Sequence, residues 1–125
     1  MVNLKGKILE VLEKAVEQAG IVAEITDSFP DDFTKDTQFQ YTEEQNKPQS
    51  LSGTKCINSY VRYRIDIWNP RSTSELAVLV DKALNGEIGL VRSDCMDDNG
   101  NSKKHKIMRY EGIVNENDGR VYSPR

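Results

Sequence analysis

The sequence predicts an α+β fold, with a mostly antiparallel sheet of four to five strands packed by two helices in the order α-β-β-α-β-β. Apolar side chains recur at helical spacing in two segments, which indicates two amphipathic helices. Several other segments alternate apolar and polar residues, as half-buried antiparallel strands do. The 125 residues suffice for one hydrophobic core. We therefore expect one domain over residues 1–115 and a polar, fraying tail over residues 116–125.

The first half of the chain predicts one helix and two short strands. Apolar residues recur at helical spacing over residues 3–19, and Gly20 follows as a stop signal. Residues 21–25 are β-prone, and residues 37–42 alternate apolar with polar side chains. Residues 43–54 hold one apolar side chain in twelve, which favours a flexible loop. That loop is interpreted either as disorder or as a segment that docks a partner.

The longest alternation in the chain covers residues 57–68 and predicts a strand with one core face. Its other face carries two arginines, an aspartate and two aromatic residues, which is unusual for a plain solvent face. They are Tyr60, Arg62, Arg64, Asp66 and Trp68. We expect Trp68 to point outward, where a partner could contact it.

The second half of the chain predicts a helix followed by a hairpin. Asn69-Pro70-Arg71 ends the strand, and Ser72, Thr73 or Ser74 can cap a helix that runs through Asn85, with Gly86 as its terminator. Strands are expected over residues 88–95 and 104–114, joined by a turn over residues 97–101.

Charge is distributed unevenly. Residues 1–50 hold five basic and ten acidic side chains, whereas residues 51–125 hold twelve and ten. This balance suits self-association or a charged protein partner better than a phosphate backbone. A basic cluster stands around the last hairpin and, with three earlier arginines, could face DNA or an acidic protein, or could simply keep the hairpin soluble. Its members are Lys103, Lys104, Lys106, Arg109, Arg62, Arg64 and Arg71.

The sequence shows no motif for catalysis, a cofactor or a metal, so we expect none of the three. Cys56 and Cys95 are far apart, and the lone His105, expected at the surface, cannot complete a zinc site with them. A calcium-loop alignment of residues 95–106 places Lys106 where a bidentate glutamate is needed. A nuclease-like site would need Asp66, Asp94, Asp97 and Glu111 to converge on Lys106, and no tight motif links these residues.

No apolar run approaches the roughly 18 residues that span a bilayer, and the N-terminus lacks a signal-peptide pattern. We therefore expect a protein that starts in a cytoplasm and has no contact with a membrane.

Three features together resemble the tail terminator (tail completion) proteins of long-tailed phages and prophages. A strand ends in Ile65-Asp66-Ile67-Trp68, a Ser/Thr-capped helix with Ser74-Glu75-Leu76 follows, and the closing strand carries Arg109-Tyr110. The resemblance covers about residues 3–115 and lies in architecture and weak motifs. It implies a non-enzymatic virion component that forms a ring, usually a hexamer, which caps the tail tube and ends its polymerisation. It also implies a tail tube protein and a head-tail connector protein as partners, and DNA passing through the lumen without specific binding.

The resemblance implies a place in the virion tail or neck, and in the bacterial host cytoplasm during assembly. The expected oligomer or partner interface consists of Arg62, Arg64, Asp66, Trp68, Arg71, Lys103, Lys104, Lys106 and Arg109. The loop 43–54 and the hairpin 94–105 could reach neighbouring subunits. Three alternatives stay open: another head-tail connector or neck protein, a small metal-dependent nuclease, and a regulatory module that binds an acidic host protein.

Overall fold

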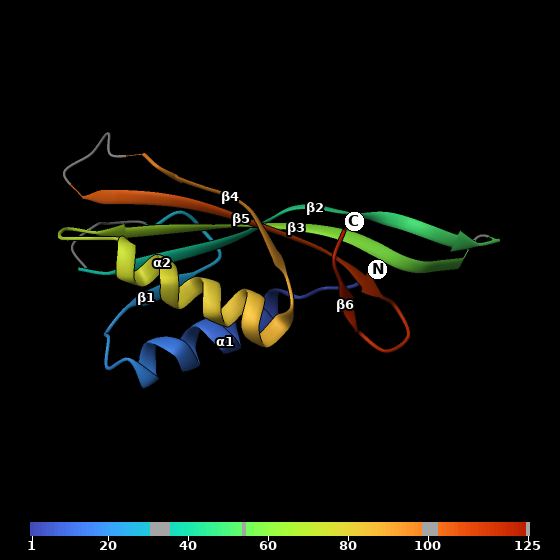
Figure 1. The fold of residues 1–125 in the computed structure, drawn as a ribbon, viewed down its shortest axis with the longest axis horizontal. Helices are drawn as coiled ribbons and strands as arrows, with labels where there is room; N and C mark the ends of the chain where they lie inside the picture. Colours follow the sequence, from blue (N-terminus) through green and yellow to red (C-terminus); the bar gives the residue numbers. More distant parts are fainter. Residues whose placement is uncertain (31–35, 54, 99–102, 125) are drawn as a thin grey trace.

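The fold is described by a computed structural model over residues 1–30, 36–53, 55–98 and 103–124 (Figure 1). Within these residues it combines two helices with one curled, mostly antiparallel sheet, so the α+β prediction is confirmed. In chain order the elements are α1 (Lys5–Gln18), β1 (Glu24–Thr26), β2 (Gln38–Ser52), β3 (Lys55–Asn69), α2 (Ser74–Asp81), the π-helical segment η1 (Lys82–Ile88), β4 (Val91–Asp97), β5 (Lys104–Asn115) and β6 (Val121–Tyr122).

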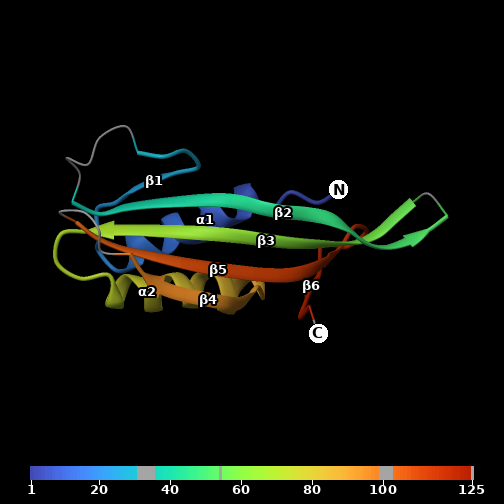
Figure 2. The same cartoon turned by 90° about the horizontal axis from the view of Figure 1, so that it is seen from above.

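The described strands form one sheet in the order β1-β2-β3-β5-β4, with β6 paired to β5. β1 runs parallel to β2, and the other described pairs are antiparallel. Figures 1 and 2 show α1 and α2 on the same side of this sheet. The sheet therefore has a helix-covered face and, on the other side, a face that we call the open face.

The core lies between the helices and the covered face of the sheet. Alternate residues of β3 point into it, and Val61, Tyr63, Ile65 and Ile67 are fully buried. α1 contributes Ile8, Val11, Leu12 and Val16, whose spacing places them on one side of the helix. Each fully buried aliphatic side chain of this kind stabilises the fold by about 1.5–3 kcal/mol relative to an exposed one.

The prediction of a loop over residues 43–54 is wrong, because β2 continues through this polar stretch to Ser52. Thr54 lies outside the described residues. β2 and β3 each hold 15 residues and pair along a long hairpin, with register shifts at Glu43/Gln45 and near Ser50. Backbone hydrogen bonds to β3 hold the segment, so it needs no apolar side chains to remain a strand. β3 pairs with β5 only as far as Asn58. Residues 49–53 and 55–57, which we call the hairpin arm, therefore extend beyond the third strand and past the helices (Figures 1 and 2).

The second helix also differs from expectation, since it ends after Ile88 rather than at Gly86. α2 passes without a break into η1, and the backbone turns at Gly89, whose φ is 95°. Gly86 fits inside the helical segment, whereas the left-handed conformation at position 89 favours glycine. The expected side-chain cap is absent at Thr73; the Ser72 hydroxyl instead accepts a hydrogen bond from the Ser74 amide at 3.2 Å.

The strand number and order also differ from the prediction. The described chain has three strands before α2, where the sequence predicted two or three, and it places a short strand, β6, in the tail that was expected to fray. Val121 of β6 packs against the core and pairs with Val114 of β5. The expected turn over residues 97–101 lies partly outside the described residues. Among the described residues, no helix is long and apolar enough to cross a membrane.

Candidate functional site

The open face gathers most of the charged residues that the sequence singled out on β3. Alternation along the strand places Arg62, Arg64 and Asp66 on this side, opposite the buried core residues. Arg109 of β5 stands directly beside Arg64 in the sheet register. Two arginines side by side would repel each other, so carboxylates must compensate them.

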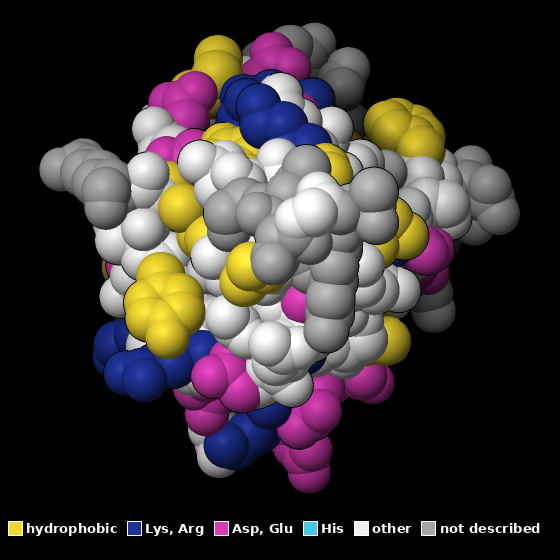
Figure 3. Space-filling view, turned by 90° about the vertical axis from the view of Figure 1, so that its right-hand side faces the viewer, with side chains coloured by type: hydrophobic (Ala, Val, Ile, Leu, Met, Phe, Trp, Pro, Cys, Tyr) yellow, Lys and Arg dark blue, Asp and Glu magenta, His cyan; other side chains and the backbone are white. Residues whose placement is uncertain are grey.

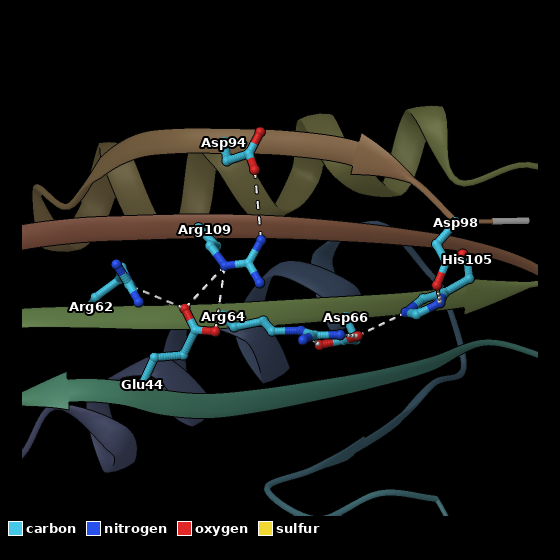
Figure 4. A network of polar contacts seen from close by, with 8 residues as sticks. All are labelled: Glu44, Arg62, Arg64, Asp66, Asp94, Asp98, His105 and Arg109. Atoms are coloured by element: carbon cyan, nitrogen blue, oxygen red, sulfur yellow. Dashed lines mark hydrogen bonds and ion pairs between the residues drawn. The ribbon is translucent and has the colours of Figure 1, made fainter.

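One carboxylate cluster is centred on Asp66, which is 3% exposed (Figure 4). Arg64 donates two hydrogen bonds to it, from Nε to Oδ1 and from Nη2 to Oδ2, both at 2.8 Å. His105 Nε2 lies 2.7 Å from the same Oδ2, and its Nδ1 lies 3.6 Å from Asp98. The hydrogen bond to Asp66 raises the pKa of Arg64 above its usual value. Asp66 thus fixes the positions of two neighbouring side chains.

A second cluster is centred on Glu44, which comes from the polar half of β2. Glu44 Oε1 accepts a hydrogen bond from Arg62 Nε and another from Arg109 Nε, each at 3.1 Å. Arg109 Nη1 also lies 3.6 Å from the carboxylate of Asp94 on β4. The cluster therefore joins β2, β3, β5 and β4 across the open face, as Figure 4 shows.

Trp68 lies on the open face but does not point outward into solvent as expected. Its side chain is 2% exposed, because the His105 ring stacks on it at 4.5 Å and Phe29 contacts it edge-on at 5.8 Å. His105, expected at the surface, is buried as well, at 7% exposure. These two rings stabilise one end of the open face, and among the described residues Phe29, 64% exposed, meets solvent there.

The opposite end of the open face combines aromatic and basic side chains. Tyr60 donates a hydrogen bond of 2.6 Å to Glu111, and Lys47 Nζ lies 5.3 Å from the centre of the Tyr60 ring. Burial, followed by the hydrogen bond to Glu111, raises the pKa of Tyr60. Near this end, Arg120 lies 5.2 Å over the ring of Tyr122 on β6. Seen from the arm end, the surface carries charges of both signs with scattered hydrophobic side chains (Figure 3).

The remaining predicted interface residues do not join this cluster. Lys106 follows the alternation to the other side of β5, where it forms an ion pair of 2.7 Å with Asp97. Lys103 donates a hydrogen bond to Gln38 at 3.2 Å, and Lys104 is exposed at the start of β5. Arg71 is exposed just before α2 and lines a cavity with residues of that helix. The nine predicted residues therefore form no single patch.

A polar cavity of about 330 Å³ lies on the open face next to the Asp66 cluster. It is lined by Phe29, Gln40, Thr42, Glu44, Arg64, Asp66, Trp68 and His105. Its two carboxylates are already paired with arginines, so the cavity offers no uncompensated charge to a ligand. Among the described residues, no group of three or more histidine, cysteine, aspartate or glutamate side chains is placed to hold a metal ion.

Sequence reasoning missed Glu44 and Phe29. Glu44 stood in a segment interpreted as a loop, and Phe29 stood in a turn-rich stretch with no periodicity. The alternation of residues 37–42 was a signal for Glu44. If the strand predicted there had been extended by two residues, the same alternation would have placed Glu44 on the open face. For Phe29 the sequence carried no such signal.

Comparison with protein-family models and with curated proteins found no match for this chain. The fold and the open face together define the class of protein: it is an α+β protein whose open sheet face carries arginines paired with carboxylates. Among the described residues, Arg62, Arg64 and Arg109 of this face are each paired with a carboxylate, from Glu44, Asp66 and Asp94 respectively.

Proposed function

We propose that this protein is a tail terminator of a long-tailed phage or prophage. In this proposal it is a structural virion component that assembles as a homo-oligomeric ring, a hexamer, on the finished tail tube. The ring ends polymerisation of the tube and joins the tail to the head connector. The protein works in the tail or neck of the virion and assembles in the bacterial cytoplasm.

The observation that carries this proposal is the hairpin arm. β2 and β3 stay paired past Asn58, where the pairing of β3 with β5 ends, so two strands project beyond the rest of the sheet. Such a projection suits reaching a neighbouring subunit in a ring. The resemblance of residues 3–115 to tail terminators, stated from the sequence, supports the same role.

The paired charges of the open face support a protein partner. Arginines prearranged by carboxylates lose little conformational freedom on docking, and they give specificity through hydrogen bonds. A ring lined by such a balanced face would let DNA pass without binding it specifically.

The proposal is tested by removing the arm. Residues 49–58 are replaced by Asn-Gly, which joins the paired residues Pro48 and Ser59 through a two-residue turn. We expect light scattering to show a ring for the wild type and no ring for the truncated protein. In a tail-tube polymerisation assay, wild-type protein should limit tube length and the truncated protein should not.

The control is the thermal unfolding curve, which should stay cooperative because the described core is intact. A wild-type chain that neither forms rings nor binds tube ends would overturn the proposal. Binding to a head connector without binding to the tube would identify a different neck component instead.

A further inference from the structure

The outer surface of α2 carries an apolar stripe that the subunit leaves uncovered. The sheet side of the helix buries Leu76 and Val80 in the core. The outer side presents Val78, which is 57% exposed, next to the half-buried Leu79. Single exposed apolar side chains are common on protein surfaces, so Val78 gains its meaning from the groove that it borders together with Leu79.

This stripe forms one wall of a groove between α1 and α2. The groove has a volume of about 470 Å³, and its opposite wall consists of Ala15, Gln18 and Ala19 of α1. Alanines at these positions keep the groove shallow enough for a helix to approach its floor. A helix that packs on another lies about 8–10 Å away from it, with side chains of one filling grooves of the other.

Two opposite charges flank the stripe at equal distances. Glu75 stands before it and Lys82 after it, and both line the groove. They are seven residues apart, so they lie about two turns, roughly 10 Å, from each other on the same side of the helix. Glu87, the third charged residue that lines the groove, is paired with Lys14 at 2.9 Å. Within the part of the chain that the structure describes, neither Glu75 nor Lys82 forms an ion pair.

We propose that this groove binds the α2 helix of a second copy of the chain, antiparallel and about a twofold axis. The midpoint between positions 75 and 82 falls between Val78 and Leu79. An antiparallel copy therefore places Glu75 against Lys82 of the second copy, Lys82 against its Glu75, and the apolar stripes against each other. A parallel copy would place Glu75 against Glu75 and Lys82 against Lys82, so like charges would meet. A partner surface with charges of one sign only would leave either Glu75 or Lys82 without an opposite charge. The self-complementary pattern selects the second copy.

This contact is separate from the proposed ring. It uses the helix layer, whereas the hairpin arm and the open face belong to other surfaces of the molecule (Figures 1 and 2). It joins two chains, or two rings, back to back through their helices.

Charge exchange tests the contact, with Glu75→Lys, Lys82→Glu and the double variant measured by sedimentation equilibrium in dilute salt. Each single variant faces two like-charge pairs across the axis and should weaken pairing by roughly tenfold or more. The double variant restores opposite charges across the axis, so its dissociation constant should return to within about threefold of the wild type. Recovery by the double variant cannot come from a general change in helix stability.

The matched control is Glu17→Lys, an exposed residue of α1 that makes the same change in net charge and does not line the groove. It should leave pairing unchanged. Circular dichroism should show that all four variants are folded. A wild-type chain without pairing, or a folded double variant that stays as weak as the singles, would overturn the proposal. If the chain forms no ring but still pairs through α2, sedimentation equilibrium gives the mass of two chains. The measured mass therefore distinguishes failure of this contact from failure of the proposed function.

Discussion

Asp66 is the residue that organises the open face. Its carboxylate receives two hydrogen bonds from Arg64 and lies 2.7 Å from His105, which in turn stacks on Trp68. A buried carboxylate is tolerated only when such partners replace its water. The conformation of one end of the open face therefore depends on one negative charge.

Asp66→Asn should reduce the free energy of unfolding by about 1.5–3 kcal/mol, since it removes charged hydrogen bonds and leaves Arg64 without its carboxylate. Chemical denaturation measures this change. The matched control is Asp94→Asn, whose side chain is 51% exposed and contacts Arg109 only at 3.6 Å. That change should cost about 0–1 kcal/mol. Equal losses for the two variants would contradict the organising role of Asp66.

Tyr110 joins the sheet to the second helix. Its ring is fully buried, and its hydroxyl donates a hydrogen bond of 2.8 Å to Asp81 at the end of α2. Burial, followed by this hydrogen bond, raises the pKa of Tyr110 well above its usual value. The folded state therefore keeps the phenol protonated at a pH where the unfolded chain releases the proton.

This difference predicts a loss of stability in alkali. The folded state binds more protons than the unfolded state above about pH 10, so the free energy of unfolding should fall as pH rises beyond that value. Tyr110→Phe should cost about 0.5–1.5 kcal/mol at pH 8 through the lost hydrogen bond. It should also make the alkaline decline shallower, as measured by denaturation between pH 8 and 11. An unchanged slope would show that Tyr110 does not contribute to the decline.

At the scale of elements, the close packing of β5 against its neighbours depends on Gly112. A Cβ placed there would lie 3.0 Å from a methyl group of Leu90 and 3.0 Å from one of Val121. Gly86 in the helical segment η1 is the opposite case, since a Cβ there would meet no atom within 4 Å. The two glycines therefore have different reasons to be present.

Gly112→Ala should destabilise the protein by about 1–3 kcal/mol, because the added methyl group overpacks the contact with Leu90 and β6. Gly86→Ala should instead stabilise it by up to about 1 kcal/mol through helix propensity. Thermal unfolding of both variants measures the contrast. If Gly112→Ala unfolds like the wild type, β6 must be able to move away from β5 at little cost.

At the scale of the whole molecule, the two sides of the sheet have different tasks. The covered side, with α1 and α2, supplies the core and exposes the groove on its outer surface. The open side holds the paired charges, and the hairpin arm projects from the end of the sheet. Substitutions on the two sides are far apart in the structure, so their effects on the proposed ring and on the proposed helix pairing should add.

The sequence by itself determined the elements whose periodicity is set by burial. α1 and the core face of β3 follow directly from apolar spacing, because most side chains that enter the core are apolar. The α+β class and the face of Arg62 and Arg64 followed from the same rule.

Only the tertiary structure decided which polar residues are paired and which are buried. The polar half of β2 is a strand because β3 hydrogen-bonds to it, and such backbone bonding leaves no mark on composition. Trp68 and His105 are covered because Phe29 and each other's rings close over them from separate segments. The alternation of residues along a strand predicts on which face of the sheet a side chain lies. Whether that face is buried depends on contacts with residues that are distant in the chain.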